Sequence, residues 1–205
     1  MNLPNKISFT RIFIVPIFML FIIPLPDWIL QSSVLSFMNE QLTAYNNFII
    51  NYGRYIAAAI FIIASCTDGI DGHIARKRNL VTNLGKFLDP IADKLLSTAA
   101  LIALVQLGDV WGWSVMIIIG REFLVTGLRL VAAGEGIVIA ASKLGKIKQV
   151  SQVIAISAAL LNNFPLSLFT TFSFDKFAMF IAVILTIYSG YDYIAKNLHV
   201  LKSEK

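Results

Sequence analysis

The chain has 205 residues, of which 57% are hydrophobic and 14% are charged, and its mean hydropathy is +0.75. A soluble protein of this length needs a much larger polar surface, so the composition excludes an ordinary soluble domain and predicts a polytopic membrane protein. No linker or internal repeat divides the sequence, which predicts one membrane domain over residues 1–205. The net charge of +5 accompanies no basic patch interleaved with exposed aromatic side chains, so we expect no nucleic-acid partner.

Six mainly apolar segments follow one another along the chain, and each is interpreted as the apolar part of a membrane-spanning helix. They lie at residues 12–25, 48–66, 90–107, 111–130, 150–161 and 177–193. A short amphipathic segment, residues 7–11, precedes the first of them. The sequence therefore predicts an all-α membrane protein with six transmembrane helices. The more polar connection at residues 26–47 has the length to hold a surface helix.

Basic residues fall on one side of the membrane if the six helices alternate in direction. They are Lys6, Arg11, Arg76, Lys77, Arg78, Lys86, Lys143, Lys146, Lys148, Lys196, Lys202 and Lys205. The opposite loops are mainly acidic, with Asp27, Glu40, Asp109 and Asp175, and their basic exceptions are Lys176 and Arg54. Because lysine and arginine are retained on the cytoplasmic side, we expect a protein of the cell membrane with both termini in the cytoplasm.

Four aspartates, Asp68, Asp71, Asp89 and Asp93, lie among these apolar segments. The first two are three residues apart and the last two are four apart, so on helices each pair projects from one face. Carboxylates within a membrane are costly and normally have a cationic partner. Oxygen ligands without a nearby thiolate favour Mg²⁺ or Mn²⁺, and four carboxylates can hold two ions about 4 Å apart. His73 is interpreted as a residue at the membrane interface.

Small and basic residues stand at fixed distances between the aspartates. Gly72, Ala75, Arg76 and Gly85 complete the pattern D-x2-D-G-x2-A-R-x8-G-x3-D-x3-D. On their own, the small residues are as well explained by close helix packing. All eight fixed positions together resemble the signature of the CDP-alcohol phosphatidyltransferase family, in which a phosphatidyl group passes from CDP-diacylglycerol to an alcohol and CMP is released.

This resemblance implies six transmembrane helices, an intramembrane active-site cavity open to the cytoplasmic side, and two divalent ions. It implies that the metal ligands are Asp68, Asp71, Asp89 and Asp93, and that Asp93 is also the general base. The predicted binding residues for CDP-diacylglycerol are Asn5, Asp68, Asp71, Gly72, Ala75, Arg76 and Thr82. For Asn5, Thr82 and Ser142, a contact with nucleotide or phosphate and a role as a helix cap are equally good explanations. Other family members lead us to expect a homodimer.

Further motifs resemble the bacterial phosphatidylglycerophosphate synthases within that family, and they include Arg121-Glu122 and the lysines after Ser142. The acceptor would then be sn-glycerol 3-phosphate, a dianion that needs cationic hydrogen-bond donors. We expect Arg121, Lys143 and Lys146 to bind its phosphate. A purely structural salt bridge from Arg121 to a carboxylate is an equal alternative.

Arg129 and Lys148 rank below these three cations as acceptor-binding residues. We expect both to face lipid headgroups, which attract basic side chains at the membrane surface.

Other functions stay open at the level of the sequence. Within the family, the signature fits inositol phosphate, serine or phosphatidylglycerol as acceptor equally well. An intramembrane prenyltransferase also uses aspartate clusters with magnesium, although with different spacing. A divalent-cation transporter would place carboxylates in the membrane as well, but cationic side chains such as Arg76 around the same cavity would repel its cargo.

Overall fold

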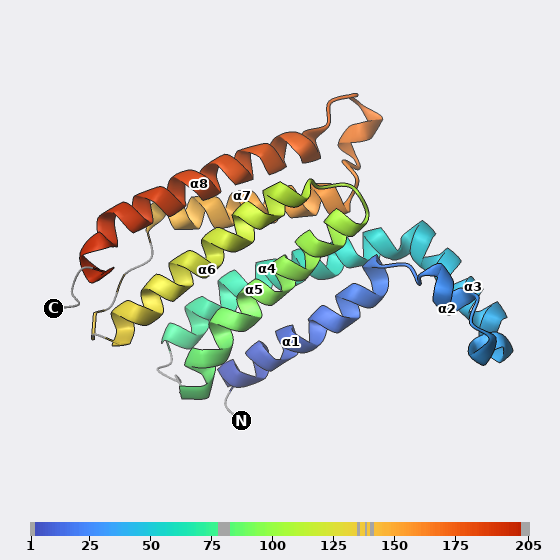
Figure 1. The fold of residues 1–205 in the computed structure, drawn as a ribbon, viewed down its shortest axis with the longest axis horizontal. Helices are drawn as coiled ribbons and strands as arrows, with labels where there is room; N and C mark the ends of the chain where they lie inside the picture. Colours follow the sequence, from blue (N-terminus) through green and yellow to red (C-terminus); the bar gives the residue numbers. More distant parts are fainter. Residues whose placement is uncertain (1–2, 78–82, 135, 138, 140–141, 202–205) are drawn as a thin grey trace. The chain divides into compact units, whose positions relative to one another are not determined.

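The structure is a computed structural model, and it describes residues 3–77, 83–134, 136–137, 139 and 142–201 (Figure 1). Within these ranges, side chains are described except at residues 3–9, 11, 33, 35, 68–77, 83–93 and 198–201. All the regular secondary structure in the described residues is helical. The predicted all-α class is therefore confirmed.

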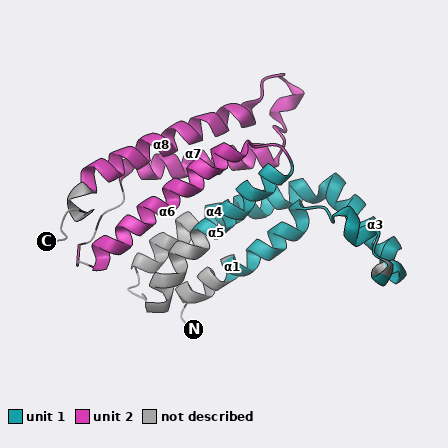
Figure 2. Ribbon diagram, viewed as in Figure 1, with its two compact units in different colours: residues 1–107 teal, residues 108–205 magenta. Residues whose placement is uncertain are grey.

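The chain divides into two compact units, residues 1–107 and residues 108–205 (Figure 2). Each unit is described by itself. The single membrane domain expected from the sequence stays a prediction.

The first unit contains three long helices and a segment of short ones. The long helices are α1 (Leu3–Ile22), α4 (Arg54–Lys77) and α5 (Asn83–Gln106), and α1 packs against both of the others. Fully buried alanines lie on α4, at Ala57 and Ala58, and on α5, at Ala100 and Ala103. Small residues at these positions allow the helices to pack closely.

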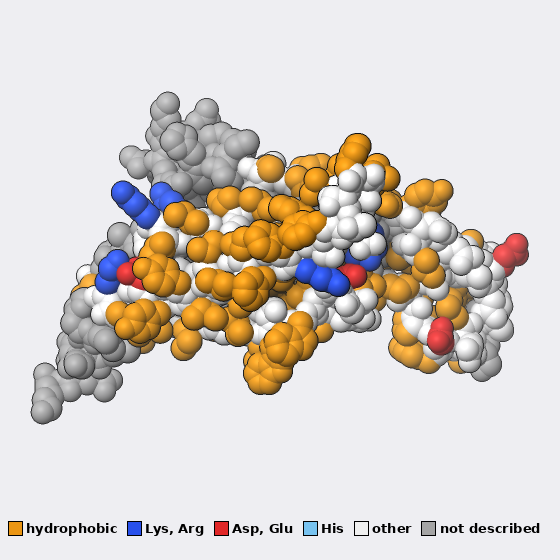
Figure 3. Space-filling model, turned by 90° about the horizontal axis from the view of Figure 1, so that it is seen from above, with side chains coloured by type: hydrophobic (Ala, Val, Ile, Leu, Met, Phe, Trp, Pro, Cys, Tyr) orange, Lys and Arg blue, Asp and Glu red, His pale blue; other side chains and the backbone are white. Residues whose placement is uncertain are grey.

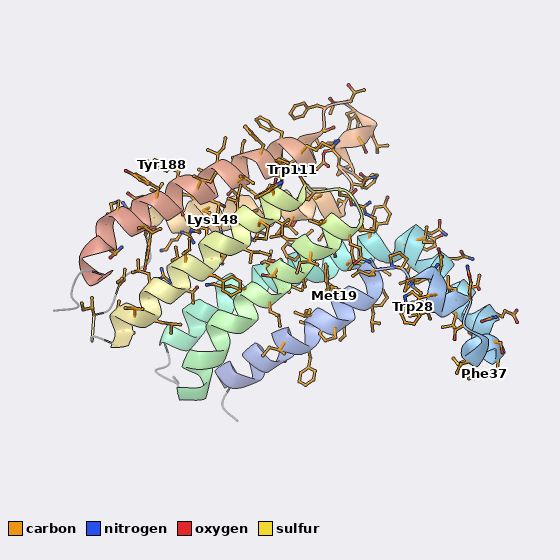
Figure 4. All side chains as sticks on the ribbon, in the orientation of Figure 1. Met19, Trp28, Phe37, Trp111, Lys148 and Tyr188 are labelled. Atoms are coloured by element: carbon orange, nitrogen blue, oxygen red, sulfur yellow. The ribbon has the colours of Figure 1, made fainter. Side chains whose placement is uncertain are left out.

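Residues 23–48 join α1 to η2 (Ile49–Gly53), and the end of α3 (Asn39–Phe48) is hydrogen-bonded to the chain at the end of α1. This connection contains α2 (Asp27–Leu30), the 3-10 helix η1 (Ser33–Met38) and α3. The amide of Leu25 donates to Asn46 Oδ1 over 2.8 Å, and the Tyr45 hydroxyl donates to the carbonyl of Leu20 over 2.6 Å. The predicted helix in this connection is thus present, and it leaves Trp28 and Phe37 largely exposed (Figure 4).

A π-helical segment, η2 (Ile49–Gly53), joins α3 to α4. Gly53 is buried there beside the end of α1. A Cβ atom on this residue would lie 2.2 Å from the carbonyl oxygen of Phe21. The contact of α1 with η2 therefore depends on the missing side chain of Gly53.

The second unit consists of α6 (Gly112–Gly134), α7 (Lys143–Leu160), the 3-10 helix η3 (Leu166–Leu168) and α8 (Phe174–Leu201). The long helix α8 packs along both α6 and α7. One apolar cluster of this unit joins Val125 and Leu128 on α6 to Tyr193 on α8, with Ile139 packed against it. A second group of buried residues, including Ile156 and Leu160, lies on α7.

Each of the six predicted apolar segments overlaps one of the long helices α1, α4, α5, α6, α7 and α8. The segment at residues 48–66 also includes the end of α3 and the whole of η2. Among the described residues, two helices are long and apolar enough to cross a membrane, residues 36–67 and 174–197. Shorter apolar helices cover residues 12–22 and 94–106. Helices α6 and α7 each contain three charged residues. Six spans accordingly stay a prediction.

Hydrophobic side chains cover most of the face shown in Figure 3, and charged side chains on it are few. The described part of the chain leaves many large apolar residues exposed along its helices, including Phe123 and Leu130 on α6 and Phe180 and Tyr188 on α8. Exposure of this extent on long helices fits a surface surrounded by lipid.

Substitution of Gly53 by alanine should destabilise the protein. The added methyl group would meet the Phe21 carbonyl, and overpacking of this kind costs about 1–3 kcal/mol. Gly127→Ala is the matched control, because Gly127 lies in α6 and a Cβ added there would have no neighbour within 4 Å, and alanine favours a helix over glycine by up to about 1 kcal/mol. The midpoint of thermal unfolding in detergent should fall for the first variant and hold or rise for the second. Equal midpoints would contradict the packing described for Gly53.

Candidate active site

The four predicted metal ligands lie within the helices α4 and α5. Asp68 and Asp71 fall within α4, and Asp89 and Asp93 fall within α5. The helical spacing assumed for each pair is therefore present in the backbone. Their side chains lie outside the described part of the chain, so the metal cluster stays a prediction. The side chains that are described contain no group of three or more His, Cys, Asp and Glu residues able to hold a metal.

The predicted donor-binding residues also lie outside the described side chains. Asn5 falls in α1, whereas Gly72, Ala75 and Arg76 fall in α4. Thr82 lies outside the described residues altogether. Their roles toward CDP-diacylglycerol stay predictions.

The predicted acceptor residues, by contrast, are described, and Arg121 is the most enclosed of them. Its side chain is 11% exposed. Its Nη2 group donates to the hydroxyl of Ser189 on α8 over 2.6 Å, and its Nη1 group donates to Glu122 Oε1 over 3.3 Å. The salt bridge considered as an alternative is therefore present. It uses only part of the guanidinium, because each Nη group carries two N–H donors and the buried Nε has no hydrogen-bond partner among the described residues.

Lys148 on α7 is buried, with its side chain 4% exposed, and its ammonium group binds Glu122 Oε1 on α6 (Figure 4). The expectation that Lys148 faces lipid headgroups is wrong. A buried ammonium group is costly unless a carboxylate pairs with it, and Glu122 supplies that carboxylate from the neighbouring helix. Arg129, in contrast, is exposed at residue level and stacks on Tyr193, with its Cζ 5.3 Å from the ring centroid and its Nε donating to the hydroxyl over 2.8 Å.

Gly190 provides space for Arg121, and Gly145 lies beside the tip of the arginine. A Cβ on Gly190 of α8 would lie 3.0 Å from Arg121 Cγ, and a Cβ on Gly145 of α7 would lie 3.9 Å from Arg121 Nη2. The arginine thus extends from α6 past α8 toward the first turn of α7. Sequence reasoning missed Ser189 and Gly190, although a Ser-Gly pair in an apolar helix is a recognised signal of a close or polar helix contact.

The first turn of α7 is capped by Ser142, whose hydroxyl accepts from the amide of Gly145 over 3.0 Å. The interpretation of Ser142 as a helix cap is therefore confirmed. Lys143 and Lys146 lie in this turn and are exposed. The α-helical hydrogen-bond pattern provides no partner for the first amides of a helix, and the helix dipole adds a partial positive charge there.

Cationic side chains and the first backbone amides of the helix concentrate positive charge at the start of α7. Arg121 reaches toward Gly145 from α6, and Lys143 and Lys146 belong to the turn itself. Arginine and helix N-termini are both good phosphate ligands, the first through paired N–H donors and the second through backbone amides. The arrangement can therefore recognise a small phosphorylated molecule.

Comparisons with known proteins identify the same family as the aspartate signature does. The pattern of the family described as CDP-alcohol phosphatidyltransferase matches residues 1–188. A Bacillus subtilis protein named CDP-diacylglycerol--glycerol-3-phosphate 3-phosphatidyltransferase is 50% identical over 202 residues, which cover 98% of each chain. A Rickettsia typhi protein of the same name is 35% identical over 94% of each chain. A probable phosphatidylglycerophosphate synthase of Mycobacterium tuberculosis is 42% identical over 71% of this chain and 67% of its own.

Replacement of Ser142 by alanine should loosen the start of α7. The hydroxyl that accepts from the Gly145 amide is lost, and removal of such a cap costs about 1 kcal/mol. Hydrogen–deuterium exchange of peptides that cover the first turn of α7 should become faster, whereas Ser142→Asn, which preserves a capping oxygen, should exchange like the original protein. If the alanine variant exchanged no faster than the asparagine variant, Ser142 would not stabilise this turn.

Proposed function

The chain belongs to the CDP-alcohol phosphatidyltransferase family, and we propose that it transfers the phosphatidyl group of CDP-diacylglycerol to sn-glycerol 3-phosphate. The products are phosphatidylglycerophosphate and CMP. The enzyme thereby acts in phospholipid biosynthesis, on the route to the anionic lipid phosphatidylglycerol.

The observation that carries the choice of acceptor is the 50% identity to the Bacillus subtilis relative over 98% of both chains. The name of that relative states both the donor and the acceptor. The described part of the second unit supports the same choice, since Arg121 extends toward the cationic first turn of α7. An acceptor without a phosphate, such as serine, would have no use for these cations.

We assign Asp68, Asp71, Asp89 and Asp93 as ligands of two divalent ions, Mg²⁺ or Mn²⁺. The donor set fits such ions, because it consists of carboxylates at helical spacings on α4 and α5 and hard cations prefer oxygen ligands. Bound there, the ions would neutralise the diphosphate of the donor and stabilise the charge that develops on it.

Residues of the chain provide the general base and the binding groups for the donor. Asp93 accepts the proton of the acceptor hydroxyl, whose oxygen attacks the phosphorus that carries the diacylglycerol. The bond from this phosphorus to the bridging oxygen breaks, and CMP leaves with that oxygen. In this scheme Asn5, Gly72, Ala75, Arg76 and Thr82 bind the cytidine diphosphate part of the donor, together with Asp68 and Asp71.

Arg121, Lys143 and Lys146 bind the phosphate of the acceptor in this scheme. Their binding of the phosphate orients the acceptor, and such positioning is a large part of the catalysis of phosphoryl transfer. We further propose that α1, α4, α5, α6, α7 and α8 span the membrane, with both termini and the active-site cavity on the cytoplasmic side, and that the enzyme is a homodimer.

The choice of acceptor is tested by CMP release from CDP-diacylglycerol and Mg²⁺ in detergent, with each acceptor supplied separately. Glycerol 3-phosphate should support release, and inositol phosphate, serine and phosphatidylglycerol should not. Release with another of these acceptors would preserve the family and overturn the acceptor. No release with any of them would favour a prenyltransferase or a cation transporter.

Removal of divalent ions with EDTA should abolish CMP release, and added Mg²⁺ or Mn²⁺ should restore it. Asp93→Asn should lower the rate at least about 100-fold even with saturating metal, because a positioned general base contributes at least that factor. Glu40→Gln is the control, as Glu40 is an exposed carboxylate at the start of α3. An Asp93→Asn enzyme with the rate of the control would remove Asp93 from the mechanism.

Neutralisation of Lys143 should weaken acceptor binding selectively. Lys143→Met should raise KM for glycerol 3-phosphate about tenfold or more, the effect expected when one charged hydrogen bond is lost, and it should leave KM for CDP-diacylglycerol unchanged. Lys196→Met is the matched control, since Lys196 is an exposed lysine on α8 that pairs with Asp192 over 2.7 Å. A rise of both KM values in the Lys143 variant would argue against a site specific for the acceptor.

A further inference from the structure

Glu122 on α6 binds two cations through one atom. Its Oε1 pairs with the ammonium group of Lys148 on α7 and accepts from Arg121 Nη1 over 3.3 Å. Two cationic groups thus share one carboxylate oxygen. Because a carboxylate repels phosphate, Glu122 is poorly suited to touch the acceptor itself.

The guanidinium of Arg121 is restrained on several sides. Glu122 holds its Nη1 group and the buried hydroxyl of Ser189 holds its Nη2 group. Gly190 gives room to its aliphatic part, and Gly145 lies beside its tip. A flexible arginine loses considerable conformational entropy when it binds a ligand, whereas a restrained one has already lost it.

Glu122 also stabilises the buried ammonium group of Lys148. The Lys148 side chain is 4% exposed, and a buried ammonium group without a carboxylate is strongly destabilising. One carboxylate therefore serves two purposes that can be separated by experiment. One is the neutralisation of Lys148, which concerns stability, and the other is the orientation of Arg121, which concerns the acceptor.

We propose that Glu122 is a positioning residue for the acceptor, which fixes the Arg121 guanidinium so that its remaining N–H groups receive the phosphate beside the first turn of α7. This inference rests on the proposed function, since it assumes that a phosphorylated acceptor binds Arg121. It assigns to Glu122 an effect on acceptor binding in addition to its pairing with Lys148.

The test compares Glu122→Gln, Lys148→Met and the double variant, with CMP release measured as a function of each substrate. In Glu122→Gln, KM for glycerol 3-phosphate should rise about tenfold, as expected for a misplaced charged hydrogen bond, and KM for CDP-diacylglycerol should stay unchanged. Its midpoint of thermal unfolding should also fall, because Lys148 has lost its carboxylate.

The double variant separates the two roles. Without the ammonium group of Lys148, the unfolding midpoint should recover, whereas KM for glycerol 3-phosphate should stay high because Arg121 still lacks its carboxylate. This variant also preserves the test if Glu122→Gln alone does not fold. Asp192→Asn is the control, since it breaks the ion pair of Asp192 with the exposed Lys196 on α8, and neither KM should change.

Three results would overturn the inference. The double variant could regain the original KM for glycerol 3-phosphate, Glu122→Gln could change both KM values equally, or its KM for glycerol 3-phosphate could fall. The failure of the proposed function looks different: the unaltered enzyme would then release no CMP with glycerol 3-phosphate, and the inference would fall with it.

Discussion

Glu122 forms ion pairs with both Arg121 and Lys148, and the packing of the second unit accommodates these buried charges. Charges buried among apolar helices destabilise a protein unless each is paired and hydrogen-bonded. Lys148 therefore faces Glu122, and the hydroxyl of Ser189 on α8 supplies a further partner for Arg121. The need to place a large guanidinium between helices also accounts for Gly190, where a side chain would press on the arginine.

The acidic and the basic side chains proposed for the reaction lie in different parts of the chain. Carboxylates of the signature belong to α4 and α5, and the cations assigned to the acceptor belong to α6 and α7. This division suits a reaction between a metal-bound diphosphate and a separate phosphate dianion, because each anion then has its own source of positive charge. The proposed reaction needs both sources of positive charge.

The sequence predicted the helices well, because long apolar segments can satisfy their backbone in a membrane only as helices. It misjudged their ends where polar residues continue a helix. Helix α7 begins at Lys143, well before the predicted start at residue 150, since Ser142 caps it and three lysines follow. Lys148 was placed wrongly and Ser189 was missed for one reason: partners from separate helices, Glu122 and Arg121, determine where they lie. The four aspartates were recognised from their spacing, and their arrangement stays a prediction.

The central claim is that the phosphatidyl group passes to glycerol 3-phosphate, and the most direct test follows the acceptor into the lipid. The purified enzyme would receive CDP-diacylglycerol, Mg²⁺ and glycerol 3-phosphate labelled with ¹³C in all its carbons, and the lipid fraction would be analysed by mass spectrometry. The account predicts a phosphatidylglycerophosphate that carries the whole label, formed in equal amount to CMP. CMP without labelled lipid, or label in no lipid at all, would contradict it.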